Sequence, residues 1–170
     1  MSIHHCFERG TVVADLHGTD KYEALRQVIH QAPVFKEISS IDSFEKAVIE
    51  REKLQSTGLG HEVAVAHGRA AGVKRVLIAL GVSREGIAYE SPDGQPVRLL
   101  FVIASPPQVS LDYLQALSTL VRCLRHSQVR NDLLTGNDPA DIEARLRAAF
   151  AAGLSPVYPL AGREPCSATG

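Results

Sequence analysis

Two stretches in the middle of the chain are apolar at almost every position: "RVLIALGV" at 75–82 and "VRLLFVIASP" at 97–106. A strand with one face in water alternates apolar and polar side chains, so a stretch without alternation indicates a strand buried on both faces. A sheet built from such strands must be covered on both sides by other elements. A third apolar stretch, "EVAVAHG" at 62–68, is interpreted as a further strand of this sheet.

Segments with apolar residues at helical spacing flank these strands in the sequence. Some open with a capping signal, an acidic residue followed three positions later by glutamate, as in Asp20 with Glu23. The predicted helices are 20–30, a second one from Asp42, 110–126 and 138–152, with a short first strand over 10–16. The predicted fold class is α/β, a single domain with a central mixed β-sheet flanked by helices on both sides.

The composition fits one soluble domain. A chain of 170 residues that is 45% apolar is long enough for one core, and we predict an N-terminal arm at 1–9, a domain at 10–152 and a flexible C-terminal tail at 153–170. The net charge of −1 gives no reason to expect nucleic acid or an anionic membrane as a partner. No leader or spanning segment is recognisable, so we expect a cytoplasmic protein without membrane insertion.

The apolar strand at 62–68 ends on a histidine, His67, between the small residues Ala66 and Gly68. A histidine at a strand end is held on a rigid base, and its small neighbours would let the surface of a partner come close. Taken alone, it is more often a packed structural residue than a catalyst. Arg51 shifts this balance, because it lies seven residues after Phe44 on an apolar helix stripe and must find an anion or reach solvent.

Glycines between the two residues allow them to meet. Gly58 and Gly60 permit a tight backbone, with positive φ, that brings the end of the Arg51 helix beside the strand. The pair then offers a nucleophilic imidazole nitrogen next to a guanidinium that binds phosphate well.

The stretch "REKLQSTGLGHEVAVAHGR" at 51–69 resembles the active-site signature of the fructose/mannitol-type enzyme IIA domains of the bacterial phosphotransferase system, which include nitrogen-regulatory IIA proteins. The resemblance continues through "GIAYESPDGQPVRLLFVIASP" and "YLQALSTLVRCL", and it covers about residues 10–150. Several motifs in a fixed order are more specific than any single match.

The resemblance implies a phosphohistidine carrier. His67 would accept a phosphoryl group, through Nε2, from an HPr-type phosphocarrier protein and pass it to a IIB domain, for sugar transport or as a regulatory state in nitrogen regulation. Arg51 matches the active-site arginine. Transfer between imidazoles needs positioning and charge compensation and no metal or cofactor. We also expect a backbone carbonyl to hold the second ring nitrogen.

Thr57, Gly58, Gly68 and Tyr113 are predicted to support the phosphate. For Thr57 the alternative is capping of its own turn, and for Tyr113 it is an ordinary half-buried helix position. Tyr113 stands where many family members carry a second histidine, and its O–H could donate to a phosphoryl oxygen.

Two further positions depart from the family pattern. Ala66 replaces a proline, and Glu62 replaces a glycine and would add a carboxylate near the site. The substitution at Ala66, together with that at Tyr113, favours the alternative function, a non-catalytic regulatory binding module of the same fold that docks a transporter or kinase. A metal-dependent hydrolase would need more clustered carboxylates and histidines than the sequence offers. Arg69, Lys74 and Arg75 could form a basic rim for an acidic partner, or only solvated surface.

Overall fold

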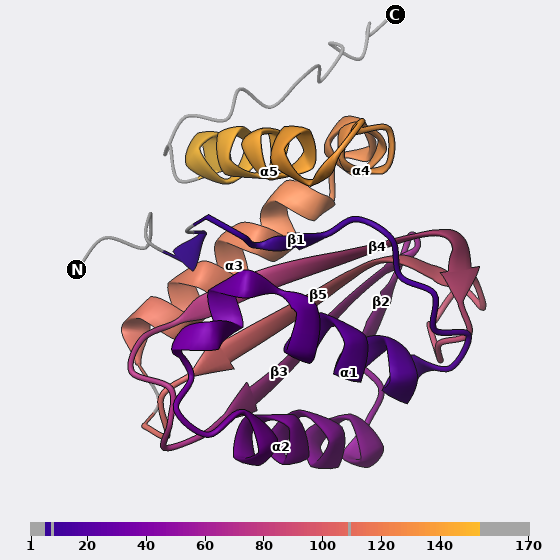
Figure 1. Cartoon of the computed structure of the whole chain (residues 1–170). Coiled ribbons are helices and arrows are strands. Elements are labelled where there is room, and N and C mark those ends of the chain that lie inside the picture. The colour runs from indigo at the N-terminus through magenta and orange to yellow at the C-terminus, as the bar shows by residue number, and fades with distance from the viewer. Residues whose placement is uncertain (1–5, 8, 109, 154–170) are drawn as a thin grey trace, which may run out of the picture.

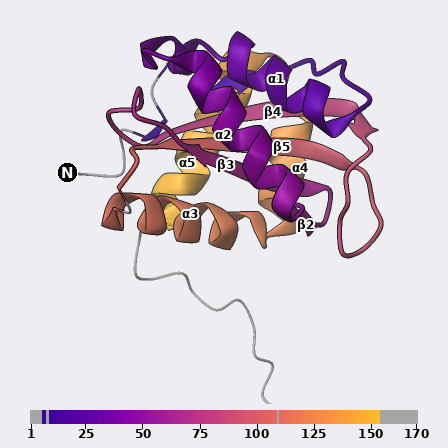
Figure 2. The same ribbon diagram turned by 90° about the horizontal axis from the view of Figure 1, so that it is seen from below.

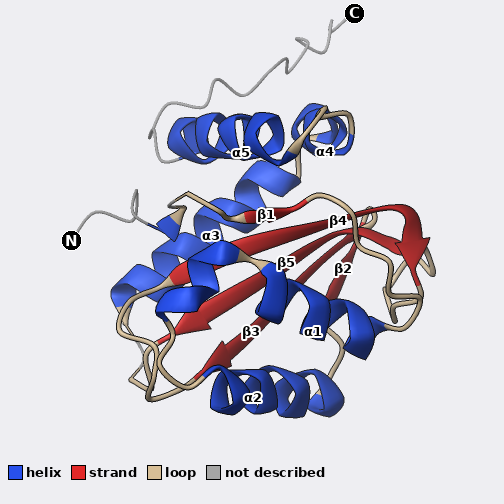
Figure 3. Ribbon diagram, viewed as in Figure 1, coloured by secondary structure: helices blue, strands red, loops and turns tan. Residues whose placement is uncertain are grey.

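The computed structural model describes residues 6–7, 9–108 and 110–153. Its centre is a five-stranded sheet with the strand order β1-β4-β5-β3-β2. The strands are β1 (Val12–Val13), β2 (Gly58–Gly60), β3 (Val63–Arg69), β4 (Leu77–Ile87) and β5 (Val97–Ser105). β3 runs parallel to β5 and β1 parallel to β4, whereas β4 is antiparallel to β5 and β2 antiparallel to β3. The sheet is therefore mixed, as predicted (Figure 3).

Helices cover both faces of the sheet (Figures 1 and 2). One layer holds α1 (Lys21–Gln31), the 3-10 helix η2 (Pro33–Glu37) and α2 (Ile41–Leu54), and the other holds α3 (Leu111–Leu124), α4 (Ser127–Leu134) and α5 (Pro139–Gly153). Each layer packs on its own apolar cluster, because the central strands bury side chains on both faces. The predicted α/β class with helices on both sides is confirmed.

β3 shows how one strand serves both clusters. Ala64 and Ala66 belong to the cluster that contains α2, while Val63 and Val65 belong to the cluster that contains α3. Successive side chains of a strand point to opposite faces, so this alternation is the expected one. It places His67, two residues after Val65, on the face that α3 covers.

Several element boundaries differ from the prediction. The first strand is only Val12–Val13, although Thr11 and Leu16 on either side of it also bond to the backbone of β4, and the strand predicted over 75–82 continues to Ile87. The helix predicted over 110–126 ends at Leu124, and the following α4 was not predicted. β2 has only three residues, too few for a strand pattern to be recognised. The last helix, predicted over 138–152, is observed over Pro139–Gly153, a difference of one residue at each end.

The chain before residue 10 is not wholly separate from the domain. Cys6 and Phe7 are each 4% exposed, and the Phe7 ring lies edge-on to that of Phe150, with 4.6 Å between the ring centroids. Cys6 and Phe7 therefore belong to the core, whereas Arg9 is exposed. The predicted tail lies outside the described residues from 154 onward. None of the helices in the described part has the length and apolar character needed to cross a membrane.

Candidate functional site

His67 lies near the carboxyl end of β3, where the strand is at the edge of the sheet. β2 pairs only with the beginning of β3, at Val63 and Ala64, so within the described part of the chain no strand lies beside His67 on that side. The imidazole is half-buried and lies next to the ring of Tyr113 in α3, with 5.9 Å between the ring centroids and 49° between the planes. The carbonyl that we expected at the second ring nitrogen is not found among the described residues.

Arg51 lies in the last turn of α2 and is half-buried. Its Nη1 donates to the carbonyl oxygen of Gln55 at 2.9 Å, which satisfies a carbonyl at the end of the helix. No carboxylate of the described residues forms an ion pair with this guanidinium. The positive charge of Arg51 acts on His67, where it helps to lower the pKa of the imidazole.

The pKa of His67 lies below its ordinary value of 6.5. Burial is the largest cause, followed by the positive charges of Arg51 and Arg69, while Glu52 acts in the opposite direction. A cationic imidazole is therefore disfavoured at this position. The lowered pKa thus favours the neutral form of His67, whose free nitrogen can act as a nucleophile.

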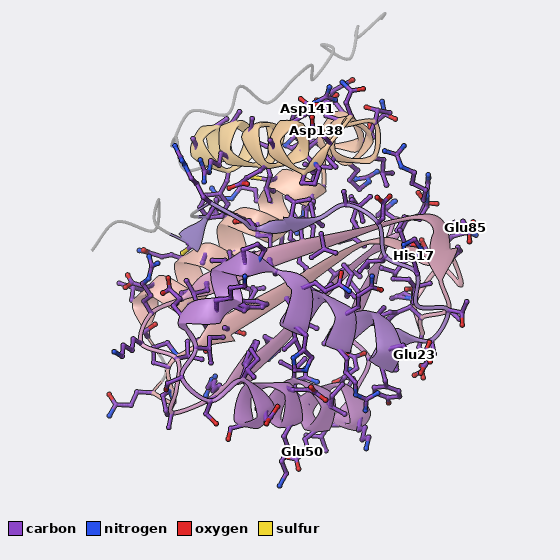
Figure 4. All side chains as sticks on the ribbon, in the orientation of Figure 1. His17, Glu23, Glu50, Glu85, Asp138 and Asp141 are labelled. Atoms are coloured by element: carbon purple, nitrogen blue, oxygen red, sulfur yellow. The ribbon has the colours of Figure 1, made fainter. Side chains whose placement is uncertain are left out.

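Glu52 is buried next to Arg51 in the sequence. It is 1% exposed, and its carboxylate accepts the backbone N–H of Thr57 at 3.0 Å and the Thr57 hydroxyl at 2.5 Å. The Lys21 ammonium lies 3.4 Å from the same carboxylate. By contrast, Glu50, two residues earlier, points away from the sheet into solvent (Figure 4). Glu52 therefore fastens the end of α2 to the connection that leads into β2.

These contacts bear on the predicted role of Thr57. Its hydroxyl donates to Glu52 and lies 3.0 Å from the Tyr89 hydroxyl, in a position that is 9% exposed. The alternative in which Thr57 caps its own turn is the one these contacts favour. Its carbonyl accepts the N–H of Val65 at 3.1 Å, which ties the connection to β3 two residues before His67.

The two glycines predicted to support phosphate have packing roles in the structure. A Cβ at Gly68 would lie 2.7 Å from Val48 Cγ2 and 2.9 Å from the Val48 nitrogen, so α2 can approach β3 only over a glycine. Our expectation that Ala66 and Gly68 leave room for a partner is wrong, because both are buried on the face that α2 covers. A Cβ at Gly58 would lie 2.5 Å from the Glu90 carbonyl oxygen.

Positive φ occurs just after Gly58, at Gly60, His61 and Glu62, with values of 86°, 54° and 65°. The carboxylate of Glu62 lies 3.6 Å from Arg98 Nη1. It precedes His67 by five residues of extended chain, roughly 16 Å. The expected extra carboxylate near the site is therefore not there.

Tyr113 and Arg69 complete the surroundings of His67. Tyr113 is 5% exposed, more buried than the half-buried alternative assumed, and burial raises the pKa of its hydroxyl. The Arg69 Cζ atom lies 5.8 Å from the centre of the Tyr113 ring. The sequence indicated Arg69 only as a possible rim residue. The two-residue spacing from His67 was the available signal, since it places both on one face of the strand.

One group of described residues has the composition of a metal site. Ligand atoms of His30, Asp42 and Glu45 lie within 4.8 Å of one another, on α1 and α2. Glu45 is also paired with Arg26, whose Nε lies 3.1 Å from the carboxylate. The group does not include His67, and its carboxylate charge is already partly neutralised.

The chain belongs to the family described as phosphoenolpyruvate-dependent sugar phosphotransferase system, EIIA 2, whose model matches residues 5–149. This confirms the resemblance found in the sequence. The chain is thus a IIA-type component of a phosphotransferase system.

Known relatives carry names for sugar transport and for nitrogen regulation. The fructose-specific EIIA component of Haloferax volcanii is 34% identical over 60% of this chain and 66% of that protein. A nitrogen regulatory protein of Bradyrhizobium diazoefficiens is 30% identical over 69% of this chain and 76% of that protein. The fructose-specific EIIABC component of Bacillus subtilis is also 30% identical, but this chain spans only 21% of its length.

Solved structures show the same fold. The nitrogen regulatory protein IIA-Ntr of Neisseria meningitidis superposes with a TM-score of 0.76 at 30% identity, covering 85% of this chain and 98% of that chain. The Escherichia coli IIA mannitol domain, in a complex with phosphorylated IIB, has a TM-score of 0.68 at 19% identity, over 83% of this chain and 96% of that chain. At that identity the likeness concerns the fold alone.

Proposed function

We propose that the chain is a phosphohistidine carrier, in which His67 accepts a phosphoryl group from an HPr-type phosphocarrier protein and delivers it to a IIB domain or holds it as a regulatory state. One observation carries the proposal: a half-buried imidazole with a lowered pKa lies beside the charge of Arg51, and that guanidinium has no carboxylate partner among the described residues. Such a cation is available to a phosphoryl oxygen.

The proposed step is an in-line transfer between two imidazoles. The lone pair of Nε2 of His67 forms the new P–N bond while the P–N bond of the donor breaks, and that electron pair returns to the donor's ring nitrogen. The proton on Nδ1 of His67 stays in place. Arg51 compensates the charge on the equatorial oxygens, so the residues of the chain supply positioning and electrostatic stabilisation.

We infer the partner proteins from the family and from the exposed apolar side chains near His67. Leu111 and Leu114 flank Tyr113 in α3 and are 69% and 51% exposed, and Leu54, just after Arg51, is 84% exposed. Exposed apolar side chains around a reactive group suit a transient protein interface. Because relatives are named for both transport and nitrogen regulation, the acceptor is either a IIB domain or a regulated target, and we place both encounters in the cytoplasm.

The test is phosphorylation from phosphoenolpyruvate with enzyme I and an HPr-type protein, read out as acid-labile phosphate. Wild type and His17→Ala, which removes an exposed histidine, should each take up phosphate, while His67→Ala should take up none. At pH 6.5 an unperturbed histidine is half protonated, but the lowered pKa of His67 leaves it more than half neutral, so uptake should hold up as pH falls to that value. Equal phosphorylation of His67→Ala and wild type would refute the assignment.

The alternative is a regulatory module of the same fold that docks a partner without carrying phosphate. The observation that favours it is Tyr113, which is buried against His67 and brings no positive charge of its own. A wild-type protein that stays unphosphorylated with an active donor system would support this alternative.

A further inference from the structure

We propose that Arg69 is a second phosphate-binding cation of this site and that the Tyr113 ring is the platform that holds it. The inference rests on the proposed function, because it assigns a further catalytic contact to the same transfer. Arg69 would donate to the phosphoryl group on His67 from β3, while Arg51 donates from the end of α2.

The strand geometry places Arg69 beside His67. The two residues are separated by one position in β3, so their side chains leave the same face of the sheet, roughly 7 Å apart at their bases. Gly68, between them, belongs to the opposite face and is covered by Val48 of α2. No side chain of β3 therefore stands between the guanidinium and the imidazole.

Tyr113 connects the two groups. Its ring centroid lies 5.9 Å from that of His67 and 5.8 Å from the Arg69 Cζ atom. The ring is fixed, because Tyr113 is 5% exposed and its backbone N–H donates to the Ser110 hydroxyl at the start of α3. A guanidinium on a fixed aromatic face gains cation–π attraction and loses part of its freedom.

Arg69 has no competing anion in the described part of the chain. Arg69 is exposed. No described carboxylate pairs with Arg69, and none pairs with Arg51. Carboxylate partners are present for other arginines of the protein, namely Arg26, Arg75, Arg98, Arg145 and Arg147. The two guanidiniums whose charges reach His67 are thus free to bind an external anion.

The chemistry benefits from a second donor. A transferring phosphoryl group spreads negative charge over three oxygens, and a single guanidinium faces only part of that charge. Tyr113, the aromatic neighbour of His67, brings no positive charge of its own. Arg69, held over that tyrosine, supplies a permanent positive charge in the same region.

The experiment compares Arg69→Gln with Lys74→Gln, which removes a nearby exposed positive charge. Phosphorylation of His67 is measured with an HPr-type protein and with phosphoramidate, a small donor that needs no protein contact. We expect Arg69→Gln to slow both reactions about tenfold or more, and Lys74→Gln to match wild type with phosphoramidate. A loss confined to the protein donor would overturn the proposal, since it would make Arg69 a docking residue.

Two further measurements test the contact between Tyr113 and Arg69, and phosphate binding by Arg69, separately from phosphoryl transfer. Combining Tyr113→Leu with Arg69→Gln should cost less than the sum of the single effects, because both remove the same contact. Binding of inorganic phosphate, followed by the NMR signals of the His67 ring, should weaken in Arg69→Gln. If wild type takes phosphate from neither donor, the proposed carrier function is refuted. The phosphate-binding measurement still tests Arg69 in that case. If Arg69→Gln binds phosphate as tightly as wild type, Arg69 is not a phosphate-binding residue.

Discussion

Glu62 has a backbone conformation that suits glycine better than glutamate. Its φ of 65° is a left-handed conformation that costs an L-residue free energy and that glycine adopts readily. The family pattern has glycine there, and the backbone explains why. Its carbonyl accepts the N–H groups of Arg98 and Leu99, so the turn cannot relax without breaking the start of β3.

Replacing Glu62 by glycine should therefore stabilise the protein by about 1 kcal/mol, because relief of the left-handed strain exceeds the weak surface pair with Arg98. Urea unfolding would measure the change. Glu50→Gly, at an exposed position inside α2, is the matched control and should destabilise by about 1 kcal/mol. If both variants lose stability to the same extent, strain at position 62 is not the cause.

At the scale of elements, the connection from α2 to β3 determines the geometry of the site. The end of α2 carries Arg51, and the buried Glu52 binds both the backbone and the hydroxyl of Thr57. Thr57 in turn bonds to Val65 in β3. A short chain of hydrogen bonds thus relates the guanidinium to the strand that bears His67, and Gly68 allows the helix to lie close to that strand.

Glu52→Ala should remove this fastening and leave the Lys21 ammonium, in a side chain only 9% exposed, with only the exposed carboxylate of Glu90 as a partner. Breaking a buried ion pair on one side costs about 3–5 kcal/mol, whereas an exposed substitution usually stays within about 0.5 kcal/mol. Urea unfolding of Glu52→Ala and of Glu50→Ala would compare the two cases. Equal, small losses would show that Glu52 contributes little to the fold.

At the scale of the whole molecule, the sheet separates two layers that meet at the site. α2 contributes Arg51 from one side, and α3 contributes Tyr113 from the other, while β3 carries His67 at the sheet edge. The outer surface of α3 carries an apolar groove with two arginines toward the C-terminal end of the helix. The groove is lined by Leu114, Leu117, Ser118, Val121, Arg122 and Arg125.

We expect Leu114→Asp to slow phosphoryl transfer from an HPr-type protein about tenfold and to leave phosphorylation by phosphoramidate unchanged, because the exposed leucine would contact the donor protein only. Leu59→Asp is the control: Leu59 is 45% exposed but lies in β2, beside the other end of β3. Slower reaction of Leu114→Asp with the small donor would instead indicate a disturbed site.

The sequence determined the fold class and most of the elements, because the signals for these are local, whereas the strand order came only from the structure. Apolar runs predicted β4 and β5, and the capping pair at Asp20 predicted the start of α1. The pair at Asp42 predicted that α2 exists but not its start, because the N-cap of α2 is Ser40. Short elements such as β2 were missed, since three residues carry no recognisable period. The order of motifs around Arg51 and His67 was also sufficient to indicate the family.

Only the tertiary structure decided which groups surround His67. Alternation along β3 says that His67 and Arg69 share a face, but it does not say which helix covers that face. Docking of α3 brings Tyr113 to both residues, and docking of α2 covers Ala66 and Gly68, which the sequence had suggested were open. Such contacts join segments far apart in the chain. They depend on how whole layers pack together, and a short stretch of sequence carries no signal of that packing.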